Sequence, residues 1–153
     1  MTISNFNDIL NMPAEDLPTR KPFPPGTYEC VVNGHYSQKD METDKGTISK
    51  LHFPLKAITA MPDVDTSALQ DMGGLNETFP DYQVFLGYND EDAKKNASGA
   101  LEFVEACGQR IKGVSYKTAI ESVINCRVMA VIKHATSRNN RIIANIARVY
   151  KVG

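Results

Sequence analysis

Apolar and polar residues alternate along several short stretches of this chain. In residues 47–60, for example, one parity holds the apolar set Leu51, Phe53, Leu55 and Ala57. Strict alternation turns one set of side chains toward a core and the other toward solvent, as in a half-buried β-strand. The pattern predicts five strands, over residues 26–36, 47–60, 82–88, 125–136 and 141–152.

Two residues predict irregularities inside the first two strands. Gly34 interrupts the alternation of the first strand and indicates a bulge or a sharp bend. Pro54 lies within the second strand, where its missing N–H favours an edge position or a bulge. The last two strands are separated by the four-residue turn 137–140 and are predicted to form a β-hairpin.

Between the third and fourth strands the apolar residues change to helical spacing. Residues 89–111 are predicted to form a helix, with Asn89 or Asp90 as its N-terminal cap and Gly108 at its end. A second short helix is predicted after Ser115, and another over residues 5–11. Residues 37–46 and 61–81 show no clear periodicity and predict a polar loop and a long loop or insertion.

Five strands with one main helix between the third and fourth follow the element order of the OB-fold, a partly open five-stranded Greek-key barrel. We therefore predict a mainly β domain over residues 26–153 with an OB-fold-like barrel. Residues 1–25 contain five prolines, which keep a chain extended, and predict a proline-rich N-terminal arm. An α+β sheet with the helix packed on one face is the alternative.

Composition is that of a globular protein. The chain has 153 residues, enough for one domain with a core, and is 42% hydrophobic and 23% charged. No apolar run approaches the roughly 18 residues that span a bilayer. The first residues lack the basic and apolar regions of a signal peptide. We therefore expect a cytoplasmic protein, in the host cytoplasm if phage-encoded, with no membrane partner.

The cysteines and the other reactive residue types form no recognisable catalytic pattern. Cys30, Cys107 and Cys126 are widely spaced and odd in number, which favours buried reduced thiols over disulfides or a zinc site. No zinc-protease, nucleophile-elbow or phosphate-loop motif occurs. We predict a non-enzymatic protein with no catalytic residues, no metal and no cofactor. A metal enzyme using Asp63 and Asp65 stays a third hypothesis.

The small net charge of −1 hides a strong asymmetry along the chain. Residues 61–110 contain ten acidic and three basic residues, a net −7. Residues 111–153 contain one acidic and eight basic residues, a net +7. This split predicts a polyanion partner for one face, although two solvated surfaces that neutralise each other would have the same composition.

Nucleic-acid binding is the function that these charges favour. Basic residues occupy the non-core parity of the second and fourth strands and the loops that would flank the binding face of an OB-fold. Aromatic side chains nearby would stack on bases, at roughly 1–3 kcal/mol each. The predicted nucleic-acid-binding residues are Tyr36, Lys39, Lys45, Lys50, His52, Lys56, Tyr82, Phe85, Arg127, Lys133, Arg138 and Arg141.

The chain also resembles small phage-encoded single-stranded DNA-binding proteins over about residues 22–152. The resemblance is carried by "PFPPGTYECVVNGHY", a Lys-Gly turn, "SKLHFPLKAI", a later acidic helical segment and the closing "CRVMAVIKH…RNNRIIANIARV". It implies an OB-fold that coats single strands in replication or recombination. Many replicative members end in an acidic tail that recruits partners, whereas this chain ends in the basic "ARVYKVG".

The predicted function is sequence-independent binding of single-stranded DNA, with RNA as a second ligand to be tested and with self-association along the strand. The acidic stretch 63–92 would take the place of the missing tail as a partner surface. The alternative is a β-rich virion structural or protein-interaction module that binds no nucleic acid and uses its proline-rich arm to contact neighbours.

Overall fold

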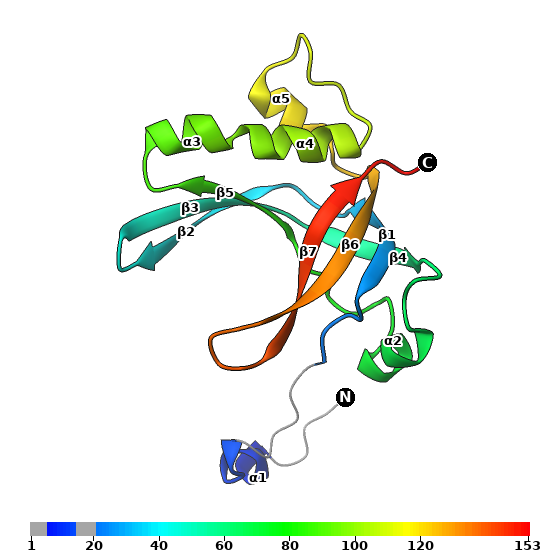
Figure 1. Cartoon of the computed structure of the whole chain (residues 1–153). Coiled ribbons are helices and arrows are strands. Elements are labelled where there is room, and N and C mark those ends of the chain that lie inside the picture. The colour runs from blue at the N-terminus through cyan, green and yellow to red at the C-terminus, as the bar shows by residue number, and fades with distance from the viewer. Residues whose placement is uncertain (1–5, 15–20) are drawn as a thin grey trace.

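The computed structural model describes residues 6–14 and 21–153, and within them the fold is mainly β. Seven strands form two antiparallel sheets (Figure 1). The strands are β1 (Gly26–Val32), β2 (Ser37–Thr43), β3 (Gly46–Phe53), β4 (Leu55–Ala60), β5 (Tyr82–Gly87), β6 (Arg127–Thr136) and β7 (Ile142–Tyr150). The helices are α1 (Phe6–Leu10), α2 (Thr66–Met72), α3 (Asp90–Asn96), α4 (Ser98–Ala106) and α5 (Tyr116–Glu121). Helices α3 and α4 lie along the three-stranded sheet, and α1 lies apart from both sheets (Figure 1).

At two places the chain continues directly from a strand of one sheet into a strand of the other. One sheet has the strand order β4-β1-β6-β7 and the other β2-β3-β5. The chain passes from the first to the second through residues 33–36, between β1 and β2, and returns through Pro54, between β3 and β4. No hydrogen-bonded pair joins β5 to β7 in the described chain, so neither sheet closes.

Both crossing points meet at one corner, where the two predicted irregularities lie. The Asn33 N–H donates to the Pro54 carbonyl oxygen at 3.1 Å. A Cβ added to Gly34 would lie 3.2 Å from Pro54 Cγ, so the two chains approach closely here. The predicted bend at Gly34 and the interruption at Pro54 are confirmed. The second expected strand divides at Pro54 into β3 and β4, which belong to different sheets, and part of the expected loop 37–46 forms β2. Seven strands therefore replace the predicted five.

The core confirms the predicted parity of the first two strands. Tyr28, Cys30 and Val32 of β1 are fully buried, and so is Phe53 of β3. Phe103 of α4 packs on Phe53 with ring centroids 4.7 Å apart, which joins the helix to the three-stranded sheet. Burial of these two rings stabilises the contact between the helix and the sheet.

Local capping explains where the helices begin and end. The Asn89 side chain accepts from the Asp92 N–H at the start of α3, and the Ser115 side chain accepts from the Thr118 N–H at the start of α5, as predicted. Gly108 has φ +80° and follows α4, which confirms the predicted stop. The single helix expected over 89–111 is wrong in detail, because it divides into α3 and α4 at Ala97.

Two predicted loops contain regular structure. Residues 37–46 form β2 and the turn to β3, although almost every β2 side chain is exposed. A strand with no buried face has no apolar alternation, so the sequence pattern could not reveal it. Residues 61–81 contain α2, which Asp65 caps by accepting from the Ser67 and Ala68 N–H groups. This helix is short and lacks a full apolar stripe.

The predicted N-terminal arm is only partly described. Residues 1–5 and 15–20 lie outside the described residues, and the helix expected over 5–11 is present as α1. Phe23 and Pro24 are buried, and the Tyr28 hydroxyl donates to the Pro24 carbonyl at 2.7 Å. The arm residues next to β1 therefore pack on the domain. Among the described helices, none has the length and apolar character to cross a membrane.

Candidate nucleic-acid interface

The strand register places several predicted site residues in two rows across the three-stranded sheet. Residues directly opposite in antiparallel strands project from the same face. Lys39 of β2 pairs with Lys50 of β3, and Lys50 pairs with Phe85 of β5. The next row begins at Ser37, which pairs with His52, and His52 pairs with Gln83. We call the surface formed by Lys39, Lys50, His52, Gln83 and Phe85 the basic face.

The basic face points away from the core. Along β3 and β5 its residues alternate with Leu51, Phe53 and Val84, whose side chains point the other way and are buried. Phe85 is 48% exposed, whereas the neighbouring Val84 is 4% exposed. The Lys50 ammonium lies 3.5 Å from the Gln83 side-chain oxygen, which links β3 to β5 on this surface. Outward lysines next to an exposed aromatic ring are the combination that binds a phosphate backbone and stacks a base.

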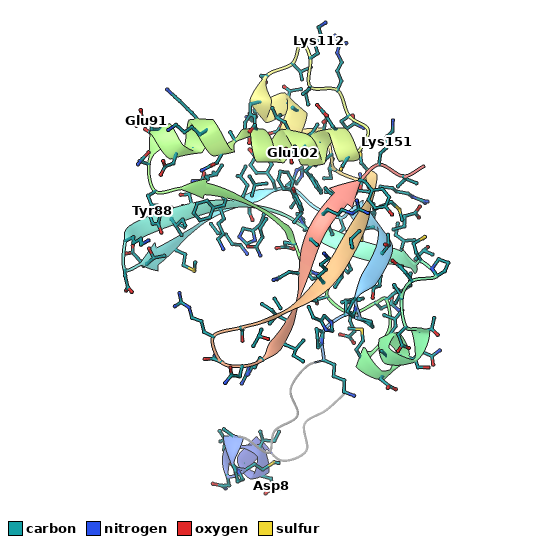
Figure 2. The ribbon with its side chains drawn as sticks, viewed as in Figure 1. Asp8, Tyr88, Glu91, Glu102, Lys112 and Lys151 are labelled. Atoms are coloured by element: carbon teal, nitrogen blue, oxygen red, sulfur yellow. The ribbon has the colours of Figure 1, made fainter. Side chains whose placement is uncertain are left out.

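A second aromatic residue extends this surface. The rings of Phe85 and Tyr88 meet edge to face with centroids 6.5 Å apart, and Tyr88 is also exposed. Tyr88 lies at the end of β5, close to the β2–β3 hairpin (Figure 2). A Cβ added to Gly46 of that hairpin would be 3.9 Å from Tyr88 Cδ1. Tyr88 therefore lies next to Phe85 at the edge of the basic face.

Two of the predicted stacking residues, Tyr36 and Tyr82, pack against rings of the core. Tyr82 is half-buried and stacks on Phe103 with centroids 4.6 Å apart and planes 14° apart. Burial raises the pKa of its hydroxyl. Tyr36 is also half-buried, with its ring centroid 6.2 Å from that of Phe53. Contact with the core leaves these rings less available to a base than Phe85.

A polar groove runs between the three-stranded sheet and β7. It is lined by Lys39 and His52, by residues 80–83, and by residues 144–146. His52 Nδ1 lies 3.5 Å from the Asp81 carboxylate at the groove wall. The groove occupies the gap where β5 and β7 fail to pair. Amide, imidazole and ammonium groups along it offer both hydrogen-bond donors and acceptors.

Two loops with positive charge lie at the ends of this surface. Lys45 is exposed on the turn between β2 and β3. Arg138 and Arg141 are exposed on the β6–β7 turn, where the Ser137 N–H donates to the Arg141 carbonyl at 2.8 Å. Asn140 has φ +59°, a conformation that asparagine tolerates better than most residues. The structure thus confirms the hairpin predicted from the last two strands.

The other predicted basic residues lie on the outward face of the four-stranded sheet. Lys56 and Arg127 both pair with Val31, so the three side chains share one face. An Arg127 guanidinium nitrogen is 3.4 Å from the Glu29 carboxylate. Lys133 pairs with Asn145, which lines the polar groove. Sequence parity grouped Lys56 with Lys50, but the change of sheet at Pro54 separates them.

The two aspartates considered as metal ligands, Asp63 and Asp65, make hydrogen bonds to the backbone of the fold. Asp63 accepts from the Thr27 N–H at 2.9 Å and from the Thr27 hydroxyl at 2.8 Å, and these bonds lower the pKa of its carboxyl. Asp65 caps α2. The described residues contain no cluster of three His, Cys, Asp or Glu side chains able to hold a metal ion.

The three cysteines are unpaired in the structure. Cys30 and Cys107 are buried, and burial raises the pKa of each thiol to about 12. A thiol of such a high pKa holds its proton near neutral pH and is a poor nucleophile. The prediction of buried, reduced thiols is confirmed for these two residues, and Cys126 is half-buried.

Comparison with protein-family models finds no match to this chain, and comparison with curated proteins finds none either. The basic face and the two loops beside it are therefore the features of the molecule that indicate a function.

Proposed function

We propose that this chain is a sequence-independent single-stranded DNA-binding protein whose sheets form a partly open barrel of the OB type. The observation that carries the proposal is the register of β2, β3 and β5. It places Lys39, Lys50 and Phe85 side by side on a surface that faces away from the core. A nucleic-acid strand needs cations for its phosphates and ring surfaces for its bases, and this row supplies both.

The strand pairing supports the OB assignment. Counted as continuous chain, β1 with β2 forms a first strand and β3 with β4 a second, which pair along both halves. The second pairs with β5, the first pairs with β6, and β6 pairs with β7. The α3–α4 segment lies between the third and fourth strands of this count. That is the element order of an OB-fold, left open between β5 and β7.

The surrounding loops fit the same proposal. In OB-folds that bind oligonucleotides, the second and third strands provide the floor of the site, and the loops after the first and fourth strands provide its walls. Here Lys45 lies on the first of these loops, and Arg138 and Arg141 lie on the second. These residues would contact phosphates, and Phe85 with Tyr88 would stack on bases. His52, Gln83 and Asn145 line the polar groove that the strand would follow.

Neither the lysines nor the aromatic rings would read base identity, so binding would depend little on sequence. Phosphate contacts release counterions, which makes the affinity fall with salt by roughly 0.7 log units per log unit for each phosphate neutralised on a single strand. Several copies bound next to one another would coat and protect a long strand.

The direct test is fluorescence anisotropy with a labelled 30-nucleotide single strand, about as long as several OB-fold sites. The titration is run at low and moderate salt with duplex DNA and single-stranded RNA of the same sequence as controls. We expect single-strand binding that weakens steeply with salt, and weaker duplex binding. Absence of single-strand binding at low salt would refute the proposal. The RNA arm establishes whether the sugar 2′-hydroxyl matters.

The alternative function, a protein-interaction or virion structural module, is favoured by a different observation. Ile142 is 59% exposed near the tip of the β6–β7 hairpin, and Ile143 is also exposed. Such residues usually need a partner surface. A module of this kind would assemble with itself and show no salt-sensitive binding to oligonucleotides, so the same titration distinguishes the two functions.

A further inference from the structure

The exposed isoleucines of β7 belong to an apolar groove next to the polar one. Ile142 and Ile143 form one side of it, and Phe23 and Phe79 form the other. The two grooves share Pro80 and Ala144, so they are continuous. The charged residues in its lining are Lys21 and Glu77. An apolar groove that opens to solvent beside a binding face is suited to an amphipathic peptide segment.

Helix α1 is such a segment, and its Ile9 and Leu10 side chains are exposed. Leu10 is 64% exposed, and Ile9 and Met12 are exposed as well. The backbone hydrogen bonds of this region are local, from the Asn11 N–H to Asn7 and from the Met12 N–H to Ile9. In Figure 2 the labelled Asp8 marks α1 lying apart from both sheets. A helix of five residues has little stability by itself in water, so it needs a surface to pack on.

Charge complementarity connects the helix to the groove. Residues 1–16 contain Asp8, Glu15 and Asp16 and no lysine or arginine. The β6–β7 hairpin that carries Ile142 and Ile143 contains Lys133, Arg138 and Arg141, and no acidic residue follows Glu121 in the chain. An acidic, apolar segment is complementary to an apolar groove that lies beside a basic hairpin, because apolar side chains can pack in the groove while opposite charges attract at its edge.

We propose that α1 of one copy docks in the apolar groove of a second copy of this chain, with Ile9, Leu10 and Met12 packed on Ile142 and Ile143. The contact joins two different surfaces, so each copy keeps one free helix and one free groove. Contacts of this head-to-tail kind extend into open chains instead of closing into dimers. This deepens the proposed function, because a linear chain of copies is what coats a strand, but the contact itself requires no DNA.

The test uses two variants of the full chain that disable opposite partners. One carries Ile9→Asp and Leu10→Asp, and the other carries Ile142→Asp and Ile143→Asp. All four side chains are exposed in the single copy, so the fold should tolerate the changes, and circular dichroism checks that it does. Ile58→Asp is the matched control, because Ile58 is an exposed isoleucine on β4 outside both grooves.

Sedimentation velocity without nucleic acid gives the result. The unmodified chain and Ile58→Asp should form larger species as concentration rises, and association should weaken about 30-fold or more in each double variant, because two apolar anchors are lost. An equimolar mixture of the double variants should form a 1:1 complex and nothing larger, because only one intact helix and one intact groove remain.

Three results would overturn the proposal. They are a chain that stays monomeric at all concentrations, a helix variant that associates as the unmodified chain does, and a mixture that forms no complex. The last would mean that α1 docks on its own copy or elsewhere. A titration of the unmodified chain with a short oligonucleotide, beside its sedimentation, separates this proposal from the proposed function. In the unmodified chain, DNA binding with no association refutes the docking alone, and association without DNA binding refutes the function alone.

Discussion

The outward faces of the two sheets both carry lysines, yet they differ in what surrounds those lysines. On the three-stranded sheet, Lys39 and Lys50 share a row with the exposed ring of Phe85. On the four-stranded sheet, Lys56 and Arg127 flank Val31, and Arg127 is paired with Glu29 at 3.4 Å. The first surface therefore joins cations to an aromatic ring beside a groove, and on the second an arginine is paired with a glutamate.

Under the proposed function, positive charge alone would not define the nucleic-acid surface. A lysine on an exposed strand also prevents edge aggregation and keeps the domain in solution. What distinguishes the basic face is the coincidence of charge, ring and groove, and that coincidence depends on which strands are neighbours. If the interpretation is right, equivalent substitutions on the two sheets will have unequal effects on DNA binding.

The largest difference is expected between two exposed aromatic residues. Phe85→Ala should weaken single-strand binding by roughly 1–3 kcal/mol, the value of one base stacked on a side chain. Tyr150→Ala on β7 is the matched control, because Tyr150 is 39% exposed and lies on the other sheet. Its ring already faces Arg148, with the guanidinium carbon 5.4 Å from the ring centroid. Anisotropy titrations of both variants against one oligonucleotide measure the difference.

Equal losses from the two variants would contradict the placement of the stacking platform on β5. Thermal unfolding of each variant is needed beside the titrations. Phe85 lies outside the buried core, so we expect its replacement to change stability much less than binding.

Charge reversal at Lys50 and at Lys56, which lie on different sheets, tests whether DNA binding is confined to the three-stranded sheet. Lys50→Glu should weaken binding about ten-fold at low salt and reduce the salt slope, because a phosphate contact is lost and a repulsion is added. Lys56→Glu makes the same change on the same parity of the continuous chain, but beyond Pro54 on the other sheet. We expect little change in binding there. Similar losses at both positions would indicate a diffuse electrostatic surface.

The hairpin loop should have a smaller effect that does not depend on sequence. Replacing Arg138 and Arg141 together by alanine should remove about 1.4 from the log-log salt slope, or roughly 0.7 for each phosphate contact. Affinity should fall by a similar factor for all oligonucleotide sequences, since phosphate contacts carry no base information. An unchanged slope in a titration from low to moderate salt would exclude these arginines from the interface.

The sequence predicted the core better than the surface. Alternation correctly assigned Leu51 and Phe53 to the interior. Cap and stop residues correctly marked helix ends at Asn89, Gly108 and Ser115. Both kinds of signal are local in the sequence. The strand β2 escaped prediction because its residues are exposed and polar, and its hydrogen bonds come from β3. Which lysines face one groove depends on long-range register, including the shift between Ser49 and Lys50 that sets Phe85 opposite Lys50.

The smallest effect should be confined to the stability of the four-stranded sheet. Asp63 accepts two hydrogen bonds from Thr27 of β1, and they lower the pKa of its carboxyl. A carboxyl whose pKa is lower in the folded state than in the unfolded chain stabilises the fold above the unfolded pKa, which is about 3.9 for aspartate. That stabilisation is lost as the pH falls through the lower folded value.

Asp63→Asn should therefore lower the free energy of unfolding at pH 7 by about 0.5–1 kcal/mol, since Asp63 is exposed to solvent and the acceptor of its two part-buried hydrogen bonds loses its charge. Urea unfolding of both proteins from pH 7 down to the acid range should show the two free energies converging as Asp63 becomes protonated. Single-strand binding at pH 7 should stay unchanged, because Asp63 lies on neither the basic face nor the polar groove. A loss of binding at unchanged stability would move Asp63 from the scaffold to the site and would weaken the distinction between the two sheets.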